Sequence, residues 1–256
     1  MFPAGHSSAD GVTRLEVRVP IFVPLIIGVS FVLASAIGAW AFFAVHALDN
    51  TLVVTGSAKI DLESDSAKWQ ISFERKVTES TIAGGYPLLA KDLETIRAFL
   101  KASGISDDAI TVSPVTTNEI YNYNQNGNNG PRQFNLDQSV TIDSKDVHAI
   151  DTLSKNVGDL VGKGVFVSGN SVEFFVSNLA DLRVSLLADA IKDAKARAVQ
   201  IAKAGDKSVG ALKSASSGVV QVLSPNSVDV SDYGSYDTSS LKKEVMVTAR
   251  ATFFAR

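Results

Sequence analysis

The residue types that most often carry out catalysis are scarce in this chain. Its 256 residues include no cysteine, which excludes disulfides, thiol nucleophiles and metal centres ligated by cysteine. The three histidines are His6, His46 and His148, and only His148 falls in the region that we expect to fold as a soluble domain. One histidine makes neither a catalytic triad nor a zinc site, and no serine lies in a G-x-S-x-G motif.

Two short motifs superficially suggest ligand binding. Gly162-Lys163-Gly164, followed by Gly169, has the glycines of a phosphate-binding loop, but these glycines follow a predicted helix and do not open one. Asp61, Glu63 and Asp65 have the spacing of the first half of a calcium-binding loop. That loop needs a glycine and a glutamate at two later positions, and this chain has serines there. A simple turn is therefore the better interpretation of the acidic trio.

The charged residues do not form a binding surface for nucleic acid. The formal net charge is -3, and the lysines and arginines between residues 192 and 207 are interspersed with aspartates, which is typical of a solvated helix face. Paired carboxylates such as Asp107-Asp108 have no catalytic partner in the sequence. The sequence therefore predicts no catalytic, cofactor-binding or metal-ligating residue, no cofactor and no nucleic-acid partner. We expect that the protein is not an enzyme.

One long segment is suited to a membrane. From Val19 to Val45 there are 27 consecutive residues without an ionisable side chain, which exceeds the roughly 20 residues that a helix needs to span a bilayer. A buried core helix of this length rarely lacks a charge, and the run is about twice as long as the apolar region of a signal peptide. Ala34-Ser35-Ala36 resembles a cleavage site, so a cleaved signal peptide stays an alternative. We predict an uncleaved transmembrane anchor at residues 19–46.

The charges that flank this segment predict its orientation. Arg14 and Arg18 precede it, whereas no lysine or arginine follows it before Lys59. The positive-inside rule places the flank that is richer in these residues in the cytoplasm. We therefore expect residues 1–18 to be a cytoplasmic arm and residues 47–256 to be an extracytoplasmic domain. In a bacterium this describes a single-pass protein of the inner membrane with a periplasmic C-terminal domain.

Residues 47–256 alternate between short strands and amphipathic helices, as an α+β domain does. Two strands at 52–62 and 67–77 flank a turn cluster, and we expect them to form a β-hairpin with one buried face. The remaining strands are expected at 110–115, 116–122, 133–143, 165–167, 172–176, 219–223 and 243–254, and the helices at 82–103, 146–161 and 180–204, with an Asn-rich loop at 122–133 and a polar loop at 224–240. Because neighbouring strands follow each other closely, the sheets should be mostly antiparallel and packed with helices.

Two of these elements are expected to make close contacts. The helix at 180–204 has an apolar stripe whose members step by four and three residues: Leu187, Ile191, Ala194, Ala198 and Ile201. The alanines of this stripe allow another element to approach closely.

The final strand at 243–254 is expected at the edge of a sheet. There it would expose unpaired backbone groups unless another strand or a neighbouring subunit covers it.

Several segments, in their order and spacing, resemble one known family. Leu52–Ile60 is similar to the pattern I-x-V-x-G-x-G/A-x-V, and Ser66–Ile71 lies where the family has a turn and a second strand. Gly104–Thr111 is similar to G-I-x-x-x-D-I-x-T, and Asp189–Ala202 to A-v-x-D-A-r-x-k-A-x-x-l-A. These are motifs of the SIMPL-domain family, and the resemblance covers about residues 50 to 256. The chain departs from the family at Asp65-Ser66, where a proline is usual.

The resemblance implies an envelope protein without an established reaction. Bacterial members of the family are periplasmic or envelope proteins, and some assemble into large rings or cages. Roles in stress and in the cell envelope are attached to the family. The resemblance supplies neither a catalytic residue nor a cofactor for this chain.

Three functional hypotheses follow from the sequence. The first, which we favour, is a membrane-anchored, non-catalytic scaffold that forms a homo-oligomeric ring or cage and has a link to envelope stress. The second is a monomeric or dimeric periplasmic module that binds a partner or ligand. The third is a cryptic hydrolase. The partners expected under the first hypothesis are the lipid bilayer, through residues 19–46, and other copies of the same chain.

Overall fold

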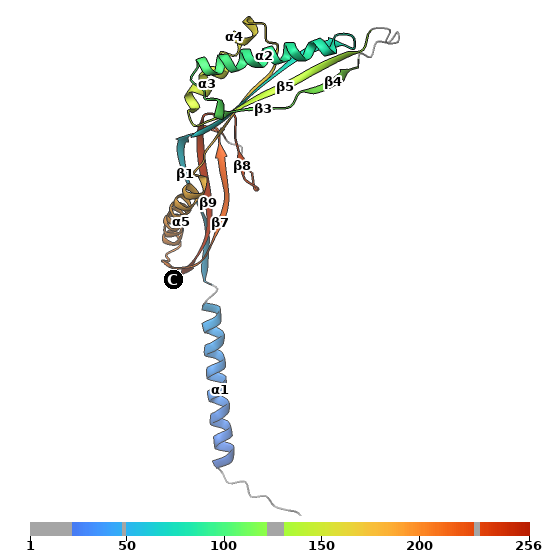
Figure 1. Cartoon of the computed structure of the whole chain (residues 1–256). Coiled ribbons are helices and arrows are strands. Elements are labelled where there is room, and N and C mark those ends of the chain that lie inside the picture. Colours follow the sequence, from blue (N-terminus) through green and yellow to red (C-terminus); the bar gives the residue numbers. More distant parts are fainter. Residues whose placement is uncertain (1–21, 48–49, 122–130, 228–230) are drawn as a thin grey trace, which may run out of the picture.

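Two β-sheets, each with helices packed on it, make up the folded part of the chain (Figure 1). The computed structural model describes residues 22–47, 50–121, 131–227 and 231–256. Its helices are α1 Phe22–Ala47, α2 Ile82–Ala102, α3 Val147–Lys155, α4 Gly158–Gly162 and α5 Leu179–Ala204, with a short 3-10 helix at Asp107–Ala109. Its strands are β1 Thr51–Glu63, β2 Ser66–Thr78, β3 Ile110–Val112, β4 Thr116–Ile120, β5 Gln133–Ser144, β6 Val167–Phe175, β7 Val209–Leu223, β8 Ser235–Tyr236 and β9 Lys242–Ala255.

The predicted α+β class with mostly antiparallel sheets is confirmed. Sheet A has the strand order β1-β9-β7-β8, and sheet B has the order β3-β5-β2-β6 with β4 also paired to β5. Every pairing is antiparallel except that of β7 with β8. The predicted cytoplasmic arm at 1–18 and most of the Asn-rich loop, residues 122–130, lie outside the described residues.

Helix α1 makes no core with the rest of the chain. Phe22–Val45 is long and apolar enough to cross a membrane, and none of it is buried. The Ser35 hydroxyl, which would be costly in lipid, donates a hydrogen bond of 2.8 Å to the Phe31 carbonyl one turn earlier. The helix therefore suits a membrane span, and a signal sequence near the N-terminus would have the same character.

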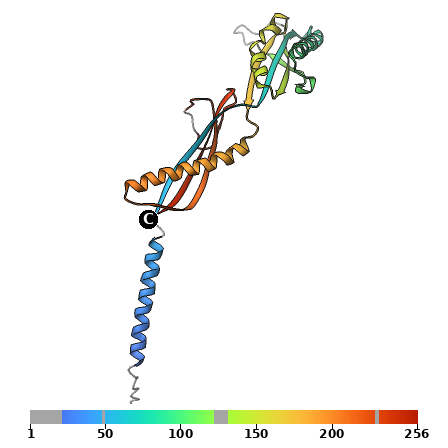
Figure 2. The same ribbon diagram turned by 90° about the vertical axis from the view of Figure 1, so that its left-hand side faces the viewer.

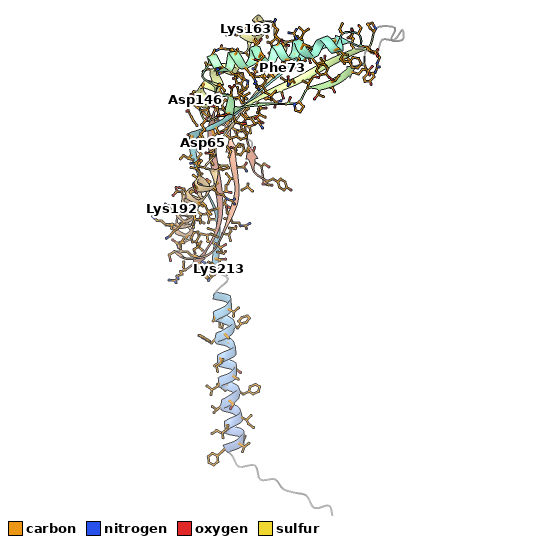
Figure 3. The ribbon with its side chains drawn as sticks, viewed as in Figure 1. Asp65, Phe73, Asp146, Lys163, Lys192 and Lys213 are labelled. Carbon is orange, nitrogen blue, oxygen red and sulfur yellow. The ribbon has the colours of Figure 1, made fainter. Side chains whose placement is uncertain are left out.

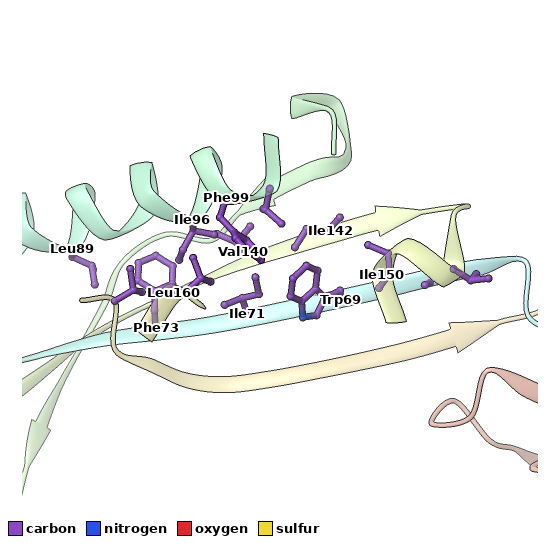
Figure 4. Close-up of a cluster of buried hydrophobic side chains, with 14 of the residues drawn as sticks. Trp69, Ile71, Phe73, Leu89, Ile96, Phe99, Val140, Ile142, Ile150 and Leu160 are labelled. Carbon is purple, nitrogen blue, oxygen red and sulfur yellow. The ribbon is translucent and has the colours of Figure 1, made fainter. Parts of the chain in front are cut away.

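Sheet B has the larger core. The alternation predicted for residues 67–73 is confirmed, because Ala67, Trp69, Ile71 and Phe73 of β2 are all buried. Helix α2 and the helical segments α3 and α4 close over this face with further buried side chains (Figure 4): Leu89, Ile96, Phe99, Ile150 and Leu160. The buried Trp69 ring keeps its polar atom satisfied, since its Nε1 donates to the Asn170 side chain at 2.7 Å.

Sheet A is held by one long helix through small residues. Helix α5 lies along β1 and β9 (Figure 2). Its buried residues recur every four positions: Leu186, Ala190, Ala194, Ala198 and Ala202. The predicted contact of Ala194 and Ala198 is confirmed, whereas Ile201 is exposed, because the buried stripe continues to Ala202 instead. Opposite these alanines stands Gly56, where an added Cβ would lie closer than 3.0 Å to the backbone of Ala190 and Ala194.

The expected hairpin of the first two strands is wrong. Strand β1 pairs with β9 in sheet A, whereas β2 pairs with β5 and β6 in sheet B. The chain therefore passes from one sheet to the other at Ser64-Asp65 (Figure 1). Alternation shows that each strand has a buried face, but it does not say which strand lies alongside. The apolar face of β1 packs on α5, and that of β2 packs on α2 and α3.

The final strand is not an edge strand. β9 lies between β1 and β7 and is paired on both sides along most of its length. Its partner β7 begins ten residues before the strand predicted at 219–223, because Val209–Gly218 has too little apolar character to signal a strand.

The helix predicted at 146–161 is interrupted after Lys155, shortly before the poor helix former Gly158. The two strand patterns around Gly169 form the single strand β6, and the polar loop at 224–240 contains β8.

A substitution at Gly56 tests the contact between α5 and β1. Gly56→Ala forces a methyl group into the helix backbone, and we expect it to lower the free energy of unfolding by about 1–3 kcal/mol. Gly84→Ala is the matched control, because Gly84 lies in α2 with no atom within 4 Å of an added Cβ. There alanine should raise stability by about 0.5–1 kcal/mol. Urea unfolding measures both changes, and equal stability of the two variants would contradict the packing described.

Candidate functional site

His148 lies on the surface beside the end of β1. Its Nε2 is 3.3 Å from the Glu63 carboxylate, and the two side chains are 67% and 45% exposed. An exposed pair of this kind contributes little to stability. Within the described residues no serine, threonine or lysine side chain bonds to its imidazole ring, since the Thr152 hydroxyl donates to the His148 backbone carbonyl instead, at 2.9 Å.

The three carboxylates that resemble a calcium loop have different partners. Asp61 lines a surface cavity, and Glu63 contacts His148. Asp65 accepts hydrogen bonds from the backbone and the hydroxyl of Ser177, at 2.9 and 2.6 Å. Within the residues that the structure describes, no group of three or more His, Cys, Asp or Glu side chains could hold a metal ion. Asp61 and Glu63 belong to strand β1, so the interpretation of the trio as a turn is correct only for Asp65, which lies between β1 and β2.

The glycine motif at 162–164 ends helix α4 and supports the core of sheet B. The Gly164 carbonyl accepts a hydrogen bond of 2.9 Å from Arg75. The same guanidinium makes two hydrogen bonds, 2.5 and 2.6 Å long, to the buried carboxylate of Asp92 in α2. The hydrogen bonds that Arg75 donates to Asp92 raise the pKa of Arg75. This network fixes α2 and the end of α4 on β2 and is structural.

The most unusual polar group of the chain is Lys243 at the start of β9. Its side chain has an exposed fraction of 0%, and its ammonium donates to the backbone carbonyl and the carboxylate of Asp237. Hydroxyl and backbone groups of Ser239 and Ser240 donate to the same carboxylate. Burial alone would raise the pKa of Asp237, but the hydrogen bonds from the serines and the charge of Lys243 outweigh it and hold that pKa well below its ordinary value. Burial lowers the pKa of Lys243, and Asp237 opposes this effect.

This buried pair lies where the two sheets meet. The segment 236–241, which carries Asp237, binds to both of them. The Tyr236 hydroxyl accepts from the backbone N–H of Val176 at 2.9 Å, and the Thr238 carbonyl accepts from Phe174 at 2.7 Å. On the side of sheet A, the backbone N–H of Asp237 donates to the Val222 carbonyl of β7 at 2.8 Å, and the Leu241 carbonyl accepts from Ser64, in the crossover between the sheets, at 3.0 Å. Segment 236–241 therefore joins the sheets, and we call it the junction segment.

A charged cavity of about 470 Å³ opens beside the junction segment. Its lining includes three lysines and three acidic residues: Lys59, Lys242, Lys243, Asp61, Glu63 and Glu244. Lys59 and Glu244 form an ion pair of 2.7 Å within this lining. No hydroxyl or histidine side chain belongs to the described lining, so the cavity has no pair of a nucleophile and a base. It can hold polar groups by charge and hydrogen bonding.

The other candidate site is the outer edge of β7. Strand β8 covers this edge only at Gln221 and Val222, and residues 211–217 are all exposed. Two surface hollows of about 630 and 310 Å³ adjoin the edge, and both are lined by Gly218, Val219 and Asp232. Leu179 and Ala180 of α5 and the side chain of Tyr233, which is 96% exposed, complete the larger one. An extended segment could add to such an edge through backbone hydrogen bonds.

Sequence reasoning identified neither the buried pair nor the open edge. Asp237 lies in a loop rich in serine and aspartate, where one more acidic residue carries no signal. Lys243 occupies an apolar position in the alternation of the last strand, since Val245 and Val247 follow it on the same face. This single break in the alternation was the available sign of a buried lysine.

The comparisons with known proteins concern the whole folded part. The family model described as SIMPL, protein of unknown function (DUF541), matches residues 52–253. This range begins in β1 and ends in β9, so it includes both sheets and the junction segment. No curated protein matches the chain.

Breaking the buried pair should be costly. Asp237→Asn keeps an acceptor for the serines but leaves the Lys243 ammonium buried without a counter-charge, and we expect a loss of about 3–5 kcal/mol in the free energy of unfolding. Adding Lys243→Met removes the buried charge and should recover most of that loss. Urea unfolding of the two single variants and the double variant at neutral pH gives the coupling energy. Additive losses would contradict the pairing.

The same pair predicts a dependence on acid. Because the folded-state pKa of Asp237 is depressed, its contribution to stability is complete above the unfolded pKa of about 4 and is lost as the pH falls toward the folded value. The wild-type chain should therefore lose more stability below about pH 4 than Asp237→Asn does. Parallel slopes of stability against pH in this range would contradict the assignment.

Proposed function

This chain belongs to the SIMPL family of unknown function, and on that premise we propose that it is a membrane-anchored, non-catalytic envelope protein that assembles into a homo-oligomeric ring or cage. In this proposal α1 spans the inner membrane, the N-terminal arm is cytoplasmic and both sheets are periplasmic. The role in envelope stress that the family resemblance implies belongs to the same proposal. The flanking charges Arg14 and Arg18 support the orientation.

The observation that carries the proposal is the open edge of β7. Its exposed part, residues 211–217, has one charged side chain, Lys213, and is otherwise made of small or apolar residues. An edge of this kind presents unpaired backbone N–H and C=O groups to any strand of matching length. The register irregularities of β7 before Ser214 and before Val220 restrict which strands can match it. We infer that its intended partner is a strand of a neighbouring subunit.

At the opposite edge of sheet A, strand β1 has a backbone group that helix α5 satisfies. The backbone N–H of Ser57 in β1 donates to the Asp193 carboxylate of α5 at 2.8 Å. That hydrogen bond, followed by the contact with Arg197, lowers the pKa of Asp193. Asp193 also forms an ion pair of 2.8 Å with Arg197, one turn further along α5. One backbone group of the β1 edge is therefore satisfied within the subunit by α5.

A second candidate function is a binding module of small size. The charged cavity beside the junction segment favours it, because Lys59, Lys242 and three carboxylates line it, and such charges could hold a polar ligand. Under this alternative the chain is a monomer or dimer. The size of the solubilised protein separates the two proposals.

We expect the detergent-solubilised chain to be an oligomer, and the fragment 50–256 to assemble as well. The described contacts of the folded part do not involve α1, so removing the anchor should not remove the interface. Light scattering at micromolar concentration should give a mass several times that of one chain for both proteins. A monomeric fragment would remove the main support for the scaffold.

Lysines on the β7 edge test which surface is used. Ser214→Lys with Ser216→Lys adds charge along the open edge and should give monomers of unchanged thermal stability. The matched control is Ala196→Lys with Gln200→Lys, on exposed positions of α5. The control should remain oligomeric. If both double variants assemble normally, the interface is elsewhere.

Cysteine labelling tests the orientation, since the chain has no cysteine of its own. Ala188→Cys, at an exposed position of α5 outside the β7 edge, should react with a membrane-impermeant maleimide in intact spheroplasts. Ser8→Cys should react only after lysis. The reverse pattern would contradict the proposed topology, and a mature protein without residue 8 would show cleavage.

A further inference from the structure

The end of sheet A that follows α1 lies close to the membrane. The 24 residues Phe22–Val45 give a helix longer than a hydrocarbon core of about 30 Å, at about 1.5 Å per residue. Three peptide units separate Ala47 from Asn50, so the two residues are at most about 11 Å apart. The Asn50 carbonyl accepts a hydrogen bond of 2.8 Å from Ala255 at the end of β9. The end of β9 and its neighbours are therefore within reach of the lipid headgroups.

Four exposed cationic side chains gather at this end of the sheet: Lys203, Lys207, Lys213 and Arg256. Backbone hydrogen bonds of 2.8 and 2.9 Å join Ser208 to Arg256, which brings Lys207 next to the last residue of the chain. Lys203 lies in the last turn of α5. Figure 3 shows Lys213 at the end of the sheet beside α1, where its ammonium stands 5.6 Å from the centre of the Phe254 ring. We call these four residues the anchor-proximal patch.

Apolar side chains accompany the anchor-proximal patch. Ile201 and Leu212 are about half exposed, and each lies within two residues of a lysine of the patch. Long cationic side chains beside exposed apolar ones are characteristic of protein surfaces that rest on a membrane interface.

The charge of this end contrasts with that of the whole chain. The formal net charge of the protein is -3, yet at this end four cationic side chains face one described side-chain carboxylate, Asp206, and the terminal carboxylate of Arg256. An anionic headgroup layer attracts such a cluster within about one Debye length, roughly 10 Å at 0.1 M salt. The three peptide units between Ala47 and Asn50 keep the end of β9, and the patch beside it, close to the headgroup layer.

We propose that the anchor-proximal patch binds anionic lipid headgroups of the leaflet from which the folded domain emerges. The proposal rests on the proposed function in one respect, that α1 spans a membrane. Bound in this way, the base of sheet A lies against the bilayer as a second point of attachment. The domain is then held in one orientation above its anchor.

The experiment uses the full chain in lipid nanodiscs, with Ala204→Cys, at the exposed last position of α5, labelled by an environment-sensitive fluorophore. The label is unique because the chain has no cysteine. We expect a blue shift of its emission in nanodiscs of phosphatidylcholine and phosphatidylglycerol relative to phosphatidylcholine alone, and loss of that shift at high salt. The same label at Ala188→Cys, an exposed position more than four turns from the end of α5, should show no shift.

Charge reversal at two lysines at a time provides the matched variants. Lys203→Glu with Lys207→Glu should abolish the shift. Lys192→Glu with Lys195→Glu makes the same change in charge nearer the middle of α5, where Figure 3 places Lys192 away from α1. This double variant should retain the emission shift. Equal emission in both lipid mixtures, or equal loss of the shift in the two double variants, would overturn the proposal. A chain that does not incorporate into nanodiscs would instead overturn the anchor, which separates failure of the patch from failure of the proposed topology.

Discussion

The structure depends on one buried charge. Sheets A and B have separate cores, and the chain crosses between them at Ser64-Asp65 and again between β6 and α5. The Lys243 ammonium is fully enclosed where they meet, and the Asp237 carboxylate is the counter-charge within its contacts. A buried ammonium is tolerated only with a partner of good geometry, so the junction segment must stay in place. Because that segment also binds the backbones of both sheets, the position of Asp237 fixes how the two halves are joined.

Local patterns in the sequence were sufficient to predict most of the strands and helices, but they were insufficient to predict which strands pair with each other. The alternation of Ala67, Trp69, Ile71 and Phe73 and the long helix ending at Ala204 could be predicted, because each depends on neighbours a few residues away. The pairing of β1 with β9 could not, since it joins opposite ends of the domain and local alternation is satisfied by any partner strand. The first half of β7 was missed because its small residues bury little apolar surface. The polar junction gave almost no sign, since a single lysine in an apolar position has many interpretations.

Sheets A and B differ in how they are packed and in which surfaces they expose. Sheet B is closed by helices over a core that contains the large aromatic residues Trp69 and Phe73. Sheet A is thin, is packed through alanine and glycine, and carries the open edge of β7 and the anchor-proximal patch. Tight packing of small residues gives rigidity with little apolar area, because close backbone contacts leave no room for movement. This suits a sheet that presents its edge and its end to other surfaces while keeping a fixed shape.

The central position of β9 has a consequence for the synthesis of the protein. The strand that completes sheet A is the last to leave the ribosome, whereas its neighbour β1 is the first of the folded part. Sheet B is formed from a continuous stretch, residues 66–175, and all of its strands are available before α5 has been made. It can therefore fold early, while β1 waits unpaired, since pairs so distant in sequence form slowly. Sheet A then closes in a single late step, and a chain that ends before β9 keeps one folded half and exposes the apolar face of the other.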